Sequence, residues 1–231
     1  MKQINIFKEI EYSFNGTENV SNFLNKLKDT SEFKNSNFKV LGELVNIPQE
    51  PKYHPEGSVW NHLCMVIDGA SIAKEFTLNK REFMWGALLH DVGKITTTVK
   101  RKGRWTSYNH DIEGYNIVKD LLIKETGDAE FTDKVAKLVR FHMHHIYILK
   151  NLPFGNIDEL IKINNINDII LLFACDKLGR GEQTVKDKKR VFEEVLRILD
   201  ILEKKSEQKY DEVRENVIKF KNKIISKQNN I

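Results

Sequence analysis

Residues 86–95 read GALLHDVGKI, an apolar run that ends in a histidine and an aspartate and is followed by a glycine and a lysine. Apolar side chains recur at helical spacing up to this point, so we expect a helix over about residues 80–92. Gly93 favours the left-handed C-cap that ends many helices. His90 and Asp91 then occupy the last turn, where neighbouring side chains point about 100° apart. We therefore expect the turn to loosen at Gly93, so that both side chains reach one point.

Helical periodicity also dominates the chain on both sides of this stretch. Residues 95–107, ITTTVKRKGRWTS, are the exception, because β-branched and aromatic residues flank a Lys-Gly turn and predict a small hairpin. Ser58 is a candidate N-cap for the helix that follows it. The sequence predicts an all-α helical bundle with one β-hairpin and a C-terminal helical pair. The other expected helices cover about residues 20–27, 38–45, 58–76, 111–126, 132–145, 158–163, 167–178, 186–205 and 209–227.

Length and composition indicate a single globular domain. The 231 residues are 40% hydrophobic and 30% charged, with 12 glycines and 4 prolines, which excludes a disordered or collagen-like chain. Cys64 and Cys175 lie in separate apolar stretches, which indicates buried thiols in a reducing compartment. No apolar run is long enough to span a bilayer, so we expect a cytoplasmic protein without membrane contact. We divide it into an N-terminal helical segment, a core and a C-terminal extension, residues 1–50, 51–182 and 183–231.

The net charge of +4 is unevenly distributed. Either of two basic groups would attract a phosphate-bearing partner, although a solvated tail and a charged turn are the simpler interpretations. The first group lies in residues 216–231, which contain no acid, and the second lies beside Trp105. The first group comprises Lys219, Lys221, Lys223 and Lys227. The second comprises Lys100, Arg101, Lys102 and Arg104.

Several histidines and aspartates lie beside apolar residues, near the ends or on the faces of predicted helices. Burying such a side chain without a partner costs several kcal/mol. One divalent cation would satisfy several of them, because neutral imidazole and ionised carboxylate suit manganese, iron, nickel or zinc. Each histidine alone would more often be a hydrogen-bonded residue, but the combination favours a metal site. The members are His62, His90, Asp91, His110, His142 and Asp176.

Other motifs with metal or phosphate chemistry do not fit. The chain contains no H-E-x-x-H, no C-x-x-C pair and no EF-hand loop. Residues 86–95 contain Gly-Lys, but six residues separate the two glycines instead of four and isoleucine follows the lysine, so the stretch is no P-loop.

The ordered pattern resembles the HD-domain metal-dependent phosphohydrolases, whose signature is H…HD…D. It looks closest to the HD domain that follows the catalytic head of bacterial CCA-adding tRNA nucleotidyltransferases. The chain is too short to include that head, so CCA addition is not implied, and residues 183–231 lie outside the resemblance. The segments that carry it lie within about residues 40–182 and are Pro48-Gln49, His54 to Gly57, His62, His90 to Lys94, His110 to Gly114, Phe141-His142 and Asp176 to Arg180.

The resemblance implies roles for individual residues. The metal ligands would be His62, His90, Asp91 and Asp176, and Asp91 would also orient the nucleophilic water or accept its proton. His110 and His142 would either complete a second metal site or contact the substrate phosphate. The cofactor would be one or two Mn²⁺, Ni²⁺, Mg²⁺ or Fe²⁺ ions.

Further residues are candidates for contact with substrate. Lys94 and Arg180 would bind its phosphate, with a structural salt bridge as the alternative for each. His54 and Glu56 are weaker candidates, since hydrogen bonding and helix capping explain them equally well. Of the histidines in residues 141–145, helical spacing favours His142 and turns His144 and His145 to other faces.

The expected activity is hydrolysis of a phosphate ester by metal-activated water. The substrate would be a nucleotide or an RNA end, and the activity that of a phosphomonoesterase, a 2′,3′-cyclic phosphodiesterase or both. The resemblance makes tRNA a candidate partner, and Trp60 and Trp105 would stack on bases unless they serve only packing. Two alternatives stay open: a nucleoside monophosphate phosphatase, and a non-catalytic, metal-stabilised HD module that binds RNA or nucleotides.

Overall fold

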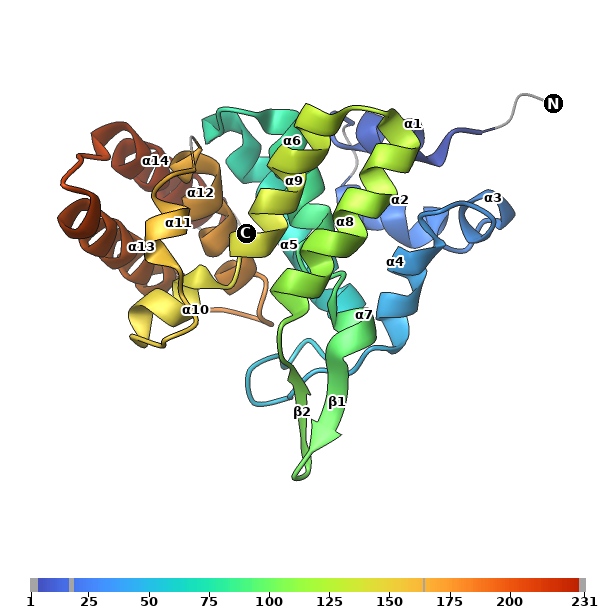
Figure 1. Ribbon diagram of the computed structural model, residues 1–231, viewed down its shortest axis with the longest axis horizontal. Coiled ribbons are helices and arrows are strands. Elements are labelled where there is room, and N and C mark those ends of the chain that lie inside the picture. The colour runs from blue at the N-terminus through green and yellow to red at the C-terminus, as the bar shows by residue number, and fades with distance from the viewer. Residues whose placement is uncertain (1–3, 17–18, 164, 229–231) are drawn as a thin grey trace.

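The computed structural model describes residues 4–16, 19–163 and 165–228 and shows an all-α bundle with one two-stranded hairpin (Figure 1). Its elements, in chain order, are α1 (Ile6–Ser13), α2 (Val20–Leu27), α3 (Ser31–Lys34), α4 (Lys39–Glu43), η1 (Leu44–Asn46), α5 (Val59–Ala73), η2 (Lys74–Phe76), α6 (Lys80–Leu89), α7 (Lys94–Thr97), β1 (Thr98–Arg101), β2 (Arg104–Ser107), α8 (His110–Thr126), α9 (Ala129–Phe141), α10 (His144–Leu149), α11 (Ile157–Leu160), α12 (Ile166–Leu178), α13 (Val185–Ser206) and α14 (Asp211–Gln228).

Three helices form the centre of the bundle: α5, α6 and α12, which pack on one another. Residues 83–89 of α6 and 166–176 of α12 are all buried, as expected for helices that are covered on every side. The α8–α9 pair packs on α6, α13 and α14 pack on α12, and α1–α4 lie at the opposite end of the molecule (Figure 1). This arrangement brings the ends of several helices together around one buried point.

Local sequence accounts for the start of several helices. The Ser58 side chain accepts a hydrogen bond from the Asn61 amide and caps α5, as predicted. Thr184 and Asp187 form a capping box at the start of α13. Apolar side chains at helical spacing form the inner stripe of α13, whose members Val191, Val195, Leu199 and Leu202 are all buried.

The expectation for Gly93 is wrong. Helix α6 ends at Leu89, and Gly93 has φ −65°, which is right-handed rather than left-handed backbone. A Cβ atom at this position would overlap the carbonyl oxygen of His110 and lie 2.5 Å from the Gly114 nitrogen. Glycine is therefore needed because the α6–α7 corner packs against the backbone of α8.

Other boundaries also differ from the predictions. The predicted helix over 132–145 is two helices, α9 and α10, because the chain turns at His142 and Met143. Residues 95–97 belong to α7 instead of the hairpin, and the hydroxyls of Thr96 and Thr97 donate to the Gly93 carbonyl. The helix expected over 58–76 ends as α-helix at Ala73 and continues as η2.

Two further observations concern burial and membranes. Cys175 is buried as expected, whereas Cys64 is only half-buried, so the prediction that it is a buried thiol is wrong. Among the helices of the described residues, none combines the length and the apolarity that crossing a bilayer requires.

Candidate metal centre

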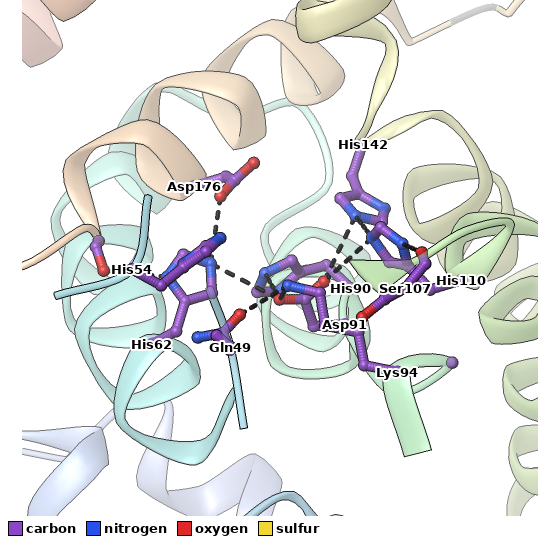
Figure 2. Close-up of polar contacts among 12 residues, drawn as sticks. Gln49, His54, His62, His90, Asp91, Lys94, Ser107, His110, His142 and Asp176 are labelled. Carbon is purple, nitrogen blue, oxygen red and sulfur yellow. Dashed lines mark hydrogen bonds and ion pairs between the residues drawn. The ribbon is translucent and has the colours of Figure 1, made fainter. Parts of the chain in front are cut away.

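The six metal-site candidates are brought together at one buried point (Figure 2). They come from the first turn of α5, the α6–α7 corner, the start of α8, the end of α9 and the last turn of α12. Their exposed fractions are His62 0%, His90 0%, Asp91 2%, His110 5%, His142 1% and Asp176 2%. Side chains separated by more than a hundred residues of sequence thus share one site.

Asp91 lies in the middle, with one carboxylate oxygen toward each of two histidine pairs (Figure 2). Its Oδ2 lies 3.3 Å from His90 Nε2 and 3.7 Å from His62 Nε2. Its Oδ1 lies 3.3 Å from His110 Nε2 and 3.6 Å from His142 Nε2. Each histidine pair forms a triad with Asp91, and the ligand atoms within each triad lie within 4.8 Å of one another. This spacing would allow one ion on either side of Asp91.

Asp176 joins the site from the His62 side. Its Oδ1 lies 3.1 Å from His62 Nε2, and its Oδ2 lies 3.4 Å from His145 Nε2. The Arg180 guanidinium also contacts both carboxylate oxygens, at 3.1 and 3.2 Å. Asp176 therefore connects the group of His62, His90 and Asp91 to a half-buried arginine and to a fifth imidazole.

The imidazole rings are held in one orientation. In each ring Nδ1 lies within hydrogen-bond distance of a backbone carbonyl, which can only accept, so Nδ1 donates and Nε2 is the nitrogen that faces the centre. The Nε2 atoms of His62, His90 and His145 are buried and have no hydrogen-bond partner. The ring-to-carbonyl pairs are His62 with Gly179 at 2.9 Å, His90 with Ala87 at 2.8 Å, His110 with Ser107 at 2.6 Å, His142 with Val139 at 2.6 Å, and His145 with His142 at 2.8 Å.

Lone pairs that face carboxylate oxygens need a cation between them, either a proton or a metal ion. Burial lowers the pKa of His62, but the Asp176 and Glu56 carboxylates outweigh it and raise that pKa to about 9. Although burial acts to raise the pKa of Asp91, Lys94 and the surrounding histidines hold it well below the usual range. Burial lowers the pKa of His145 to about 3. The donor set of neutral imidazole and ionised carboxylate fits a divalent ion.

Both predicted phosphate-binding cations make the ion pairs that the sequence left as alternatives. Lys94 Nζ lies 2.7 Å from Asp91 Oδ2 and donates to Gln49 Oε1 at 2.8 Å, with 8% of the residue exposed. Arg180 pairs with Asp176 as described above. Each cation thus touches a candidate metal ligand, and neither projects freely into solvent.

The weaker candidates form a second layer around His62. Glu56 accepts a hydrogen bond from His54 Nδ1 at 2.7 Å and lies 3.1 Å from His62 Nδ1. Burial raises its pKa, yet the two histidines bring it to about 2, so the carboxylate is ionised. Glu56 therefore orients His62, while Ser58 has the capping role that was considered for Glu56.

His145 is the residue that the sequence reasoning missed. The expectation that helical spacing turns it to another face than His142 is wrong, because residues three apart lie on the same face of a helix. The His145 ring, carried by α10, faces Asp176. The signal was the dense run FHMHH itself. His144 lies outside the centre: its ring contacts Phe141, and burial lowers its pKa to about 4.

A groove of about 830 Å³ lies elsewhere on the surface. Helices α6, α8, α9, α11 and α12 all contribute to its walls. The walls carry apolar side chains and charges of both signs, and they include none of the six candidate ligands. The groove is therefore separate from the buried cluster of candidate ligands.

Comparison with known families agrees with this geometry. A family model described as "HD domain" matches residues 59–219, so the chain belongs to the HD domain family. HD domains form a superfamily of metal-dependent hydrolases, and this chain has a His/Asp cluster suited to a divalent metal. The match begins at α5 and continues through α13 into α14, so it extends well beyond residue 182, where the motif resemblance ended.

Curated relatives are proteins named "Multifunctional CCA protein". The one from Halorhodospira halophila is 27% identical over 150 residues, 62% of this chain and 35% of the relative. That from Nitrosospira multiformis is 28% identical over 144 residues, 59% and 33% of the two chains. That from Hahella chejuensis is 30% identical over 108 residues, 46% and 24%. The alignments thus span about a quarter to a third of these relatives' length.

Proposed function

We propose that this chain hydrolyses a phosphate ester of a nucleotide or an RNA end, as a phosphomonoesterase, a 2′,3′-cyclic phosphodiesterase or both. The observation that carries the proposal is the position of Asp91, whose two oxygens each face a pair of imidazole Nε2 atoms. A buried carboxylate that faces four imidazole nitrogens, with one lysine beside it, is suited to a divalent cation.

The proposed ligands on one side of Asp91 are His62, His90 and Asp176. His110 and His142 lie on its other side, where they would hold a second ion or contact the substrate phosphate. A bound divalent ion supplies two effects, a lowered pKa for its water and a polarised phosphoryl oxygen. The centre would hold two ions if the second histidine pair binds metal, and one ion if that pair contacts the phosphate. The candidate ions are Mn²⁺, Ni²⁺, Mg²⁺ and Fe²⁺.

The chain's own residues supply position and charge. Asp91, held ionised by Lys94, would orient the attacking water and accept its proton. Lys94 and Arg180 would then contribute positive charge toward the phosphate while they keep contact with Asp91 and Asp176. The relatives' name and the resemblance to CCA-adding tRNA nucleotidyltransferases support an RNA substrate, and tRNA is the first to test.

The test combines metal analysis with a substrate panel. Purified protein is assayed on bis(p-nitrophenyl) phosphate, on 2′,3′-cyclic AMP and on the 5′, 3′ and 2′ monophosphates of adenosine, with Mn²⁺, Ni²⁺ or Mg²⁺. We expect Asp91→Ala to lower kcat/KM by about a thousandfold or more, since metal chemistry contributes several kcal/mol. Asp111→Asn is the matched control, because Asp111 is also buried but pairs with Arg140 outside the centre.

The outcomes separate the alternatives. Cleavage of the cyclic ester supports the phosphodiesterase, and cleavage of monophosphates alone supports the nucleoside monophosphate phosphatase. Stoichiometric metal without turnover of any substrate would support the non-catalytic HD module that binds RNA or nucleotides.

A further inference from the structure

The β1–β2 hairpin is a cationic arm that the metal chemistry does not use. It projects from one end of the bundle (Figure 1). Between residues 92 and 110 the sequence contains no acid, and four basic side chains of the hairpin are exposed. Within the described part of the chain, no salt bridge joins any of these four to a carboxylate. The four are Lys100, Arg101, Lys102 and Arg104.

The hairpin concentrates this charge at some cost to its own stability. Arg101 lies directly opposite Arg104 in the strand register, and like charges in such a pair are destabilising. Lys102 and Gly103 form the turn with φ of 48° and 80°, the backbone of a tight hairpin turn that favours asparagine, aspartate or glycine at its first position. A lysine at that position adds charge where a neutral residue would fit the backbone better. Such a pattern is expected where an external anion neutralises the arm.

Both ends of the hairpin are tied to the metal centre. Strand β1 follows directly on α7, which begins with Lys94, and the carbonyl of Ser107 at the end of β2 holds the His110 ring. The Trp105 amide donates to the Glu50 carboxylate at 3.2 Å. The neighbouring Gln49 contacts Lys94 in the centre (Figure 2). The arm is therefore joined at both ends to residues of the Asp91 centre.

Aromatic rings accompany the cations. The Arg101 guanidinium lies 5.0 Å from the ring centre of Tyr108, and Lys100 Nζ lies 5.7 Å from that of Trp105. Tyr108 is 63% exposed, and Tyr53, in the loop that contains Glu50, is 53% exposed. Exposed rings interleaved with cations are typical of surfaces that bind single-stranded nucleic acid, where bases stack and phosphates pair with the cations.

The other basic group of the sequence is less available. In α14, Lys219 pairs with Glu215, and Lys223 pairs with Glu75. Among the described residues, no hydrogen bond or ion pair joins these lysines to the metal centre. The hairpin is therefore the better candidate for a polyanion that must reach Asp91.

We propose that the hairpin, together with the exposed rings of Tyr53 and Tyr108, holds a single-stranded nucleic acid whose terminal phosphate ester reaches the Asp91 centre. The placement of the strand's terminal phosphate ester at the Asp91 centre rests on the proposed function, whereas binding of the strand to the hairpin does not. The inference narrows the substrate class, since an oligonucleotide would bind in preference to a mononucleotide.

The test measures binding of the metal-loaded full chain to a fluorescein-labelled single-stranded RNA of about 12 nucleotides by anisotropy. The test variant combines Lys100→Gln, Arg101→Gln, Lys102→Gln and Arg104→Gln. The control variant combines Lys219→Gln, Lys221→Gln, Lys223→Gln and Lys227→Gln, which removes the same charge from α14. Circular dichroism checks that both variants are folded.

We expect the hairpin variant to bind RNA at least about tenfold more weakly, and the slope of log affinity against log salt to fall by about 3 if all four cations contact phosphates. The α14 variant should keep the wild-type slope. Equal losses in both variants, or no loss in the hairpin variant, would overturn the proposal. Binding of a duplex as tight as that of the single strand would overturn its single-strand part.

Two further measurements identify other outcomes. If wild-type protein binds phosphatidylglycerol vesicles through the hairpin but does not bind RNA, the arm is a membrane contact and the proposal fails. Hydrolysis of bis(p-nitrophenyl) phosphate by wild-type protein reports on the metal centre independently of RNA binding. Hairpin-dependent RNA binding without any hydrolysis would therefore contradict the proposed function and leave this inference standing.

Discussion

Helix α12 carries a buried aspartate near each end, and the two have opposite surroundings. Asp168, in the first turn, accepts hydrogen bonds from the backbone amides of Leu78 and Asn79, at 2.9 and 3.1 Å, and from the side-chain amides of Asn165 and Asn167. Asp176, in the last turn, faces the Nε2 atoms of His62 and His145 together with Arg180. One carboxylate is surrounded by N–H donors, and the other is partly surrounded by lone pairs.

The difference separates a structural carboxylate, Asp168, from a proposed ligand, Asp176. Burial raises the pKa of Asp168, whose hydrogen bonds join the η2–α6 connection to α12. Asp176 is held well below its usual pKa, against the effect of burial, by Arg180 and the nearby histidines. The hydrogen bonds of Asp168 satisfy its carboxylate without an ion, whereas the imidazole nitrogens beside Asp176 leave room for a cation in addition to Arg180. Burial alone would not have separated the two residues.

The largest expected effect is the loss of hydrolysis in Asp176→Asn. Removing the negative charge weakens the metal site, so kcat/KM should fall by about a thousandfold. The measurements are steady-state kinetics and metal content per chain by elemental analysis. Asp168→Asn is the matched control and should keep its metal. Equal metal content in the two variants, with equal activity, would contradict the assignment of Asp176 as a ligand.

The next effect concerns stability. Asp168→Ala leaves the Leu78 and Asn79 amides without their acceptor, so the free energy of unfolding should fall by about 2–4 kcal/mol. Urea denaturation measures this change. Activity per folded molecule should stay at the wild-type value. A variant of unchanged stability that loses its metal would reverse the roles given to the two ends of α12.

The smallest effect is a dependence of metal affinity on pH. A proton on His62 Nε2 competes with the ion, and the pKa of this group without metal is raised to about 9. Affinity should therefore rise with pH up to about 9, by up to about tenfold per pH unit, since one proton leaves for each ion bound. Calorimetric titration with Mn²⁺ between pH 6 and 8, at about unit intervals, checks this. An affinity independent of pH would show that His62 is not a ligand.

The features that the sequence predicted correctly depend on interactions between residues close together in the chain. Apolar periodicity is a property of neighbouring residues, so the inner stripe of α13 could be read from the sequence, as could the N-cap at Ser58. The ordered His and Asp residues were also visible, because few side chains of these types occur beside apolar runs without a partner. The same reasoning failed at His145, because residues three apart share one face of a helix and the expectation placed His145 on a different face from His142.

The sequence by itself determined the helical class, the hairpin and the set of residues able to bind a metal. Only the tertiary structure decided which of their atoms face one another. It showed that Gly93 is required by the approach of α8, that Lys94 pairs with Asp91, and that Nδ1 of each central histidine is bound to a backbone carbonyl. The physical reason is that these contacts join segments far apart in the chain, so their geometry depends on how whole helices pack rather than on local sequence.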